Sequence, residues 1–142
     1  MSDVLFWLIL LAGAGQLVLC LASPFIPVAL GWPAQVRCLP KLLRQVFWTY
    51  AAYILASHVV FAAVSLLAGR QLLDGSGWAL GVSSFIAFWW GVRLILHFVA
   101  FDASEVSASG WHRIAEHLLG LLFLALTGVY LVVALFNLGV FP

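Results

Sequence analysis

The chain has 142 residues, of which 65% are hydrophobic and only 8% are charged, with a net charge of +1. Soluble domains carry roughly 25% charged residues, so this composition excludes a surface made for water and favours one made for lipid. The small net charge gives no electrostatic basis for binding nucleic acid, and none is expected as a partner. The composition therefore predicts a polytopic membrane protein of the all-α class.

Four long apolar runs, separated by three short connections, dominate the sequence. A helix needs about 20 apolar residues to cross the hydrocarbon core of a bilayer, and each run reaches that length. We therefore expect one membrane domain, a four-transmembrane-helix bundle with spans at about 4–22, 45–69, 78–101 and 113–138. The seven tryptophans favour broad contact surfaces toward lipid and membrane-protein partners over a compact catalytic pocket.

The first run carries a single amide side chain, Gln16, and leads into a connection rich in proline. Gln16 is expected to face the bundle interior, because an unpaired amide against lipid is costly. Cys20 and Cys38 match no metal or redox spacing, so both are expected to be free thiols. Proline lacks a backbone donor and fixes φ, so no continuous helix is expected across Pro24, Pro27, Pro33 and Pro40.

The second run contains one histidine, His58, and a side that is rich in hydroxyl groups. Thr49, Tyr53 and Ser57 follow one another at steps of four, so they share one face of a helix. In an oligomer this face is the part of the chain suited to line a pore. His58 is interpreted as a core histidine bonded to a nearby hydroxyl or backbone group, with haem ligation or proton relay as the alternative.

The third run is interrupted by two basic side chains, Arg93 and His97, which are four residues apart and share a helix face. An arginine inside a span is costly unless it is paired or reaches the headgroups. One interpretation is a structural arginine whose expected partner is Glu116 in the fourth run. The alternative is a residue that binds a lipid phosphate, a quinone or a substrate carboxylate.

Polar residues gather between the third run and the start of the fourth. We interpret them as a structural cluster that pins the last two helices together: Arg93, His97, Asp102, His112, Arg113, Glu116 and His117. As an alternative, His97 and His117 are expected at similar depths on adjacent helices. There they could ligate a b-type haem or, with Glu116 or Asp102, a metal ion.

No spacing signature supports a haem or a metal, so no cofactor is expected. If a cofactor binds, the candidate ligands are His58, Arg93, His97 and His117.

Basic residues are distributed unevenly between the connections. Arg37, Lys41 and Arg44 lie in or beside the first connection and Arg113 beside the third, whereas the second has Arg70 alone. The positive-inside rule then puts the first and third connections in the cytoplasm and both termini outside. We expect an integral protein of a bacterial inner membrane.

The sequence contains no nucleophile elbow, zinc-protease or phosphate-loop pattern. The leading hypothesis is a non-catalytic accessory or structural subunit of a larger membrane complex or of a homo-oligomer. One alternative is a redox protein that binds b-haem or quinone through His97, His117 and Arg93. Another is a small lipid-modifying enzyme, in which Arg93 holds an anionic head and Glu116 and His117 act as acid and base.

Overall fold

The computed structural model describes residues 1–29, 31–99 and 110–141, and for residues 110–113 it describes the backbone alone. The described part is helical throughout: α1 (Ser2–Ala22), α2 (Phe25–Ala29), α3 (Trp32–Arg37), α4 (Lys41–Leu67), the short 3₁₀-helix η1 (Gln71–Leu73), α5 (Gly77–Val99) and α6 (Gly110–Asn137). Within these ranges four helices are long and apolar enough to cross a membrane, namely α1, α4, α5 and the Ile114–Asn137 part of α6. The predicted all-α bundle of four membrane helices is confirmed.

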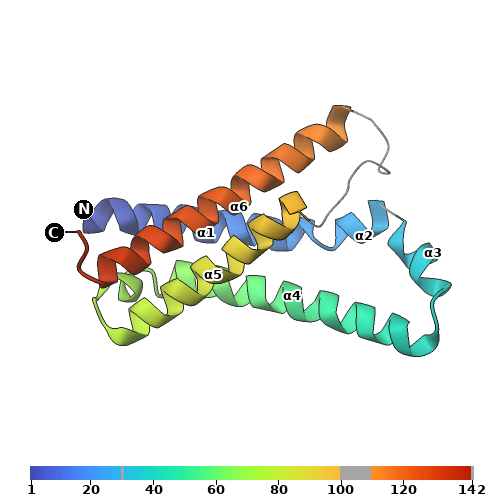
Figure 1. Cartoon of the computed structure of the whole chain (residues 1–142), viewed down its shortest axis with the longest axis horizontal. Coiled ribbons are helices and arrows are strands. Elements are labelled where there is room, and N and C mark those ends of the chain that lie inside the picture. Colours follow the sequence, from blue (N-terminus) through green and yellow to red (C-terminus); the bar gives the residue numbers. More distant parts are fainter. Residues whose placement is uncertain (30, 100–109, 142) are drawn as a thin grey trace.

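The bundle is closed at one end and open at the other (Figure 1). α1 packs against α4, α5 packs against α6, and α1 also touches α6. Both chain termini and the connection from α4 to α5 lie together at what we call the terminal end. Toward the opposite end, which we call the open end, α4 and α6 diverge, and α5 ends between them at Val99.

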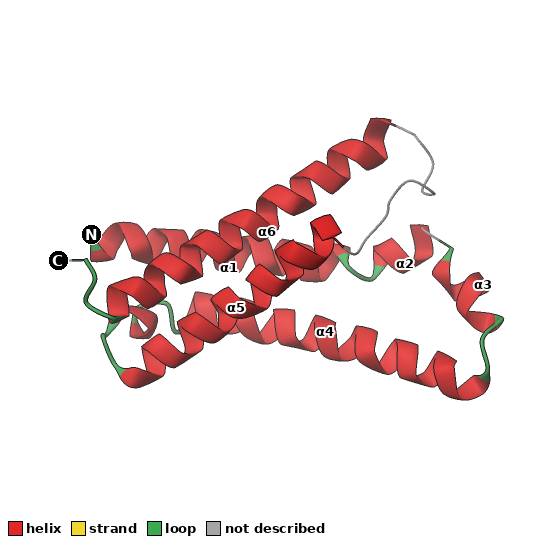
Figure 2. Cartoon of the chain, viewed as in Figure 1, coloured by secondary structure: helices red, strands yellow, loops and turns green. Residues whose placement is uncertain are grey.

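The proline-rich connection from α1 to α4 contains two short helices that the sequence interpretation did not include (Figure 2). Pro33 lies in the first turn of α3, where the helix does not need its missing N–H. Gly31 precedes α3 with a φ of 66°, a left-handed conformation that glycine adopts without strain. Pro40 is the extended N-cap of α4, so this helix begins at Lys41, before the expected start near 45. The prolines thus divide the connection into short helices, and no continuous helix crosses it.

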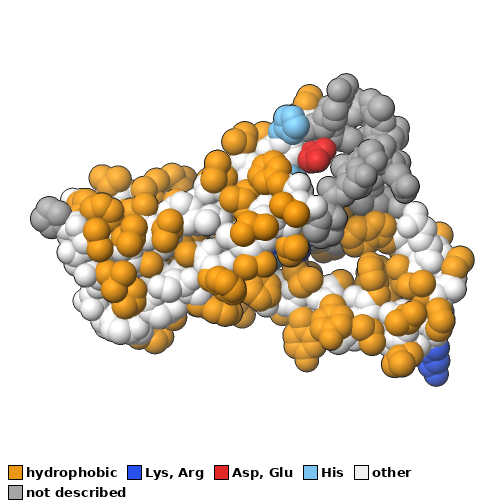
Figure 3. All heavy atoms as spheres, in the orientation of Figure 1, with side chains coloured by type: hydrophobic (Ala, Val, Ile, Leu, Met, Phe, Trp, Pro, Cys, Tyr) orange, Lys and Arg blue, Asp and Glu red, His pale blue; other side chains and the backbone are white. Residues whose placement is uncertain are grey.

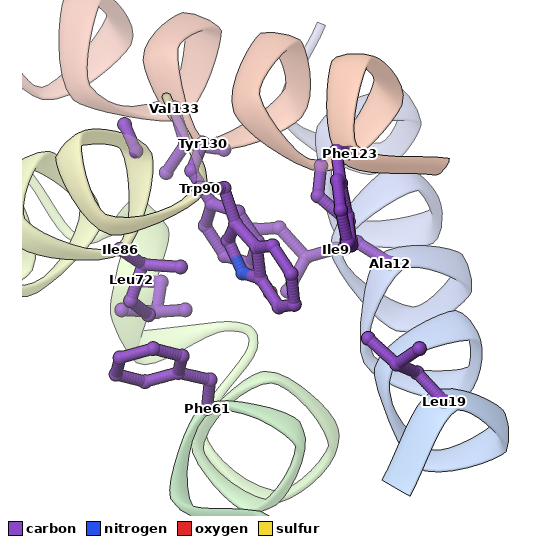
Figure 4. Close-up of a cluster of buried hydrophobic side chains, with 12 residues drawn as sticks. Ile9, Ala12, Leu19, Phe61, Leu72, Ile86, Trp90, Phe123, Tyr130 and Val133 are labelled. Carbon is purple, nitrogen blue, oxygen red and sulfur yellow. The ribbon is translucent and has the colours of Figure 1, made fainter. Parts of the chain in front are cut away.

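The buried core lies in the half of the molecule nearer the terminal end. It combines side chains from α1, α4, η1, α5 and α6, among them Ile9, Phe61, Leu72, Ile86 and Val133 (Figure 4). Buried residues begin at His58 in α4 and end at Trp90 in α5. Closer to the open end, the described residues of these two helices are half-buried or exposed. Large apolar side chains cover the visible outer surface, as lipid contact requires (Figure 3).

Two local features hold the helices together in this half. Gly13 lets α1 approach α4 closely, since a Cβ atom at Gly13 would lie 2.9 Å from the Cβ of Ser65. Asn137, at the end of α6, fastens the connection from α4 to α5. Its Nδ2 donates to the carbonyl of Leu72 at 2.8 Å, and its Oδ1 accepts from the backbone N–H of Gly75 at 3.0 Å. The terminal end is therefore tied by both packing and hydrogen bonds.

Candidate functional site

Three rings from three helices form a layer across the bundle, which we call the aromatic layer: His58 of α4, Trp90 of α5 and Phe123 of α6. The ring centroids of His58 and Trp90 are 4.8 Å apart at an interplanar angle of 23°. Those of Trp90 and Phe123 are 5.4 Å apart at 32° (Figure 4). All three side chains are buried, so the aromatic layer closes the core on the side of the open end.

Two basic side chains of α5, Arg93 and His97, follow the aromatic layer toward the open end. They come three and seven residues after Trp90, so they project from neighbouring positions of the same helix face. The Cζ atom of Arg93 lies 5.7 Å from the ring centroid of Phe123. The ring of His97 meets the ring of Phe123 edge-on, with 5.7 Å between centroids. Both basic side chains are half-buried and lie where the core ends.

Glycines lie at two positions where α5 and α6 contact each other. A Cβ atom at Gly120 would lie 3.2 Å from Nε2 of His97, and one at Gly91 would lie 3.6 Å from Cγ2 of Thr127. These contacts place Gly120 opposite His97 and Gly91 opposite Thr127 on the two antiparallel helices. In this register, the residues that precede Gly120 by more than one turn lie beyond Val99, where α5 ends.

The expected ion pair between Arg93 and Glu116 is therefore not formed. Arg93 lies beside Phe123, two helical turns away from Glu116 along α6. The expectation was wrong because it matched estimated depths in the membrane, whereas the packing of α5 on α6 places His97 beside Gly120 and Arg93 beside Phe123. Among the described residues no carboxylate pairs with Arg93.

Two buried ring nitrogens in the aromatic layer have no hydrogen-bond partner in the described structure, Nε2 of His58 and Nε1 of Trp90. His58 stacks on Trp90 and meets Trp89 edge-on at 6.4 Å. The bond to a nearby hydroxyl or backbone group that was expected for His58 is not formed by its Nε2. The indole N–H can only donate, and a neutral imidazole has one donor and one acceptor. An unpaired buried polar group costs about 1–3 kcal/mol, so these two nitrogens lower the stability of the described structure.

A hydrogen-bond chain on the terminal side of the aromatic layer was missed by the sequence interpretation. Gln16 Nε2 donates to the hydroxyl of Tyr130 at 2.7 Å, and Ser65 Oγ donates to the carbonyl of Phe61 at 2.6 Å. Because the single hydroxyl proton of Ser65 is used in that bond, the hydroxyl of Tyr130 donates to Ser65 Oγ. The chain joins α6 to α1 and α4, and it confirms that Gln16 faces inward.

The other residues singled out from the sequence are more scattered. His117 is exposed and Glu116 is half-buried, while Asp102 and the side chains of His112 and Arg113 lie outside the described residues. His97 turns to Gly120 and Phe123, and no described contact joins it to His117.

Over the described ranges, no three His, Cys, Asp or Glu side chains are grouped so as to hold a metal ion. The haem and metal alternatives stay untested predictions. Cys20, buried in α1, and Cys38, exposed after α3, are both free thiols, as expected.

The site thus consists of a buried aromatic layer with two unpaired ring nitrogens and, on its open-end side, an arginine and a histidine. Comparison of the chain with protein-family models, with curated proteins and with solved structures finds no match.

Proposed function

We propose that this small integral membrane protein is a non-catalytic accessory subunit, which packs through the outer side of α4 against a transmembrane helix of a larger membrane complex. The observation that carries the proposal is an open groove along α4, lined by Trp48, Thr49, Ala52, Tyr53 and Ala56. None of these five side chains is buried by the chain itself.

The groove lies on the side of α4 that faces away from the bundle. The half-buried residues Phe47, Ala51 and Ile54 share the inward side with His58 at helical spacing. Thr49 and Tyr53 fall on the opposite side. The hydroxyl face predicted from the sequence is therefore directed outward.

The composition of the groove suits a helix better than it suits lipid. Ala52 and Ala56 are one turn apart, and small residues at this spacing let the backbone of a second helix approach closely. Hydroxyl groups such as those of Thr49 and Tyr53 form hydrogen bonds between membrane helices, whereas lipid tails offer them no partner. A helix from another subunit is thus the occupant that uses both properties.

We further infer a bacterial inner membrane as the location, with the open end in the cytoplasm. Arg37, Lys41 and Arg44 belong to α3 and to the first turn of α4, at the open end, and Arg70 lies at the terminal end. Cys38, the exposed thiol at the open end, gives a native label. A membrane-impermeant maleimide should modify Cys38 only after intact cells are permeabilised, and modification in intact cells would overturn this orientation.

Site-directed crosslinking in the native host tests the accessory role. In a Cys38→Ser background, Ala56→Cys places a thiol in the groove, and Leu124→Cys places a matched thiol on an exposed site of α6. A short bismaleimide should join Ala56→Cys to a different membrane protein and leave Leu124→Cys uncrosslinked. In a second measurement, native mass determination should show the 15.5 kDa chain within a larger assembly. A protein that stays monomeric in gentle detergent and forms no such crosslink would overturn the proposal, as would crosslinks to its own copies alone.

A further inference from the structure

We propose that the helix that occupies the groove on α4 carries an acidic side chain, an aspartate or a glutamate, which pairs with Lys41 at the open end. This inference rests on the accessory role proposed above and names the chemistry of the partner. It starts from the face of α4 that holds the groove. The residues of this face recur at steps of three or four, which places them on one side of a helix: Lys41, Gln45, Trp48, Ala52 and Ala56.

Two polar residues continue the groove toward the open end. Lys41 and Gln45 are exposed, and they precede Trp48, the first residue of the groove, on the same face of α4. At 1.5 Å per residue, Lys41 lies about 22 Å from Ala56 along the helix. A spanning helix is about 30 Å long, so one helix that packs along the groove also passes Lys41.

A neighbouring helix at this position changes the surroundings of the ammonium group. The helix covers part of Lys41 and takes the place of the water and the lipid headgroups around it. A charge that is removed from water is costly unless it is paired. A carboxylate on the covering helix supplies that pair.

The start of α4 favours an anionic group for a second reason. Peptide dipoles give the N-terminus of a helix a partial positive charge, which acidic side chains in the first turn complement. α4 has no acidic residue in its first turn, and its N-cap, Pro40, forms no side-chain hydrogen bond. The ammonium group of Lys41 adds to the positive charge there. A carboxylate from outside the helix therefore interacts favourably with both the helix end and Lys41.

The described carboxylates of the chain itself lie elsewhere. Asp3 is in the first turn of α1 and Asp74 follows η1, both at the terminal end. Glu116 belongs to α6, and α4 and α6 diverge toward the open end. Figure 3 shows a basic side chain at the tip of the arm formed by α4 and an acidic one on the arm above it. Within the part of the chain that the structure describes, no carboxylate is placed to pair with Lys41, and the occupant of the groove is the source that the groove implies.

Carbodiimide crosslinking tests this inference, because Lys41 is the single lysine among the 142 residues. A water-soluble carbodiimide joins an amine to a carboxylate that is paired with it. The amide bond forms between Nζ of Lys41 and the carboxyl carbon, and the reagent takes up the water that is lost. In membranes of the native host, mass spectrometry of the crosslinked peptides should find Lys41 bonded to an aspartate or glutamate of another membrane protein. That protein should be the one that Ala56→Cys captures through the bismaleimide.

Three variants separate the charge of Lys41 from its amine and from its neighbours. Lys41→Arg removes the amine and keeps the charge, so it should abolish the carbodiimide product and leave co-purification of the partner unchanged. Lys41→Gln should abolish the product and lower co-purification about fivefold, as expected for the loss of a partly covered ion pair. Arg37→Gln is the matched control, because Arg37 is an exposed cation of α3 at the same end. It should keep the product and change co-purification by less than about twofold.

The inference and the accessory role fail in different ways. If Ala56→Cys captures a partner and no Lys41-dependent product forms with that partner, the inference is overturned and the accessory role stands. If Ala56→Cys captures no other protein, both are overturned, even where Lys41 forms a product elsewhere. Equal losses of co-purification in Lys41→Gln and Arg37→Gln would also overturn the inference, because they would indicate a general attraction of the basic end to anionic lipids.

Discussion

Replacing Tyr130 by phenylalanine tests the hydrogen-bond chain that joins α6 to α1 and α4. The substitution removes one hydroxyl and leaves the buried ring in place. That hydroxyl accepts from Nε2 of Gln16 at 2.7 Å and donates to Oγ of Ser65. Oε1 of Gln16 is already unpaired in the described structure, so the substitution leaves the whole buried amide without a partner.

The expected loss follows from these contacts. Hydrogen bonds between membrane helices contribute about 0.6 kcal/mol on average and up to about 1.7 kcal/mol, and a buried donor left unpaired costs about 1–3 kcal/mol. Ser65 loses less than Gln16 does, because its hydroxyl still donates to the carbonyl of Phe61 at 2.6 Å. We therefore expect Tyr130→Phe to lower the free energy of unfolding by about 2 kcal/mol.

Unfolding in mixed micelles by titration with sodium dodecyl sulfate, followed by tryptophan fluorescence, measures this loss. Tyr53→Phe is the control, because Tyr53 is 68% exposed on the outer side of α4, and it should change the free energy by less than about 0.5 kcal/mol. Adding Gln16→Leu to Tyr130→Phe should recover part of the loss, because it removes the orphaned amide. The reasoning would be refuted if Tyr130→Phe and Tyr53→Phe lowered the free energy of unfolding equally. It would also be refuted if Gln16→Leu lowered it further when added to Tyr130→Phe.

Three further outcomes are expected in the same half of the molecule. Gly13→Leu should lower the free energy of unfolding by about 1–3 kcal/mol through overpacking. Gly128→Leu is its control, because no atom lies within 4 Å of the added Cβ, and it should leave the free energy of unfolding nearly unchanged. Equal effects of the two variants would contradict the close approach of α1 and α4. Asn137→Ala should lower the free energy of unfolding by about 1–2 kcal/mol. It should also speed amide hydrogen exchange in the connection from α4 to α5, because Asn137 forms hydrogen bonds with that connection. Unchanged exchange there would contradict this role of Asn137. Ser76→Ala should raise the pKa of the exposed Asp74 carboxyl, which hydrogen bonds from the side chain and backbone of Ser76 hold below its usual value. With a folded pKa below the unfolded value of about 3.9, Asp74 favours folding above that pH and loses its contribution as the pH falls through the folded pKa; an NMR titration with no upward shift would contradict this.

The spans and one inward-facing residue were predictable from the sequence because they depend on local composition. Gln16 stands in an uncharged run and must face inward whatever its partner is, and the structure buries it completely. α4 begins at Lys41 with Pro40 as its N-cap, so the helix includes polar residues that precede the apolar span expected from about 45. The short helices α2 and α3 were missed because proline interrupts long helices but is tolerated in a first turn.

The contacts of Arg93 and Tyr130 were harder to predict because they depend on how helices face each other. The contact of Arg93 with Phe123 follows from the register of α5 against α6, and one sequence does not reveal that register. Tyr130 did leave a signal. It shares a stripe of three- and four-residue spacing with Phe123 and Asn137, and two polar members in an otherwise apolar stripe indicate an inward face.

The extent to which polar side chains are hydrogen-bonded differs between the aromatic layer and its terminal side. On the terminal side, the hydroxyls of Ser65 and Tyr130 and the amide of Asn137 form hydrogen bonds between helices, and Ser65 and Tyr130 are buried. In the layer itself, two buried ring nitrogens, those of His58 and Trp90, lack hydrogen-bond partners among the described residues. On the terminal side Oε1 of Gln16 is the buried side-chain atom without a partner among the described residues, and an unpaired buried polar group lowers stability where it lies. Stability therefore resides mainly in the terminal half, where the buried core and the hydrogen bonds between helices lie.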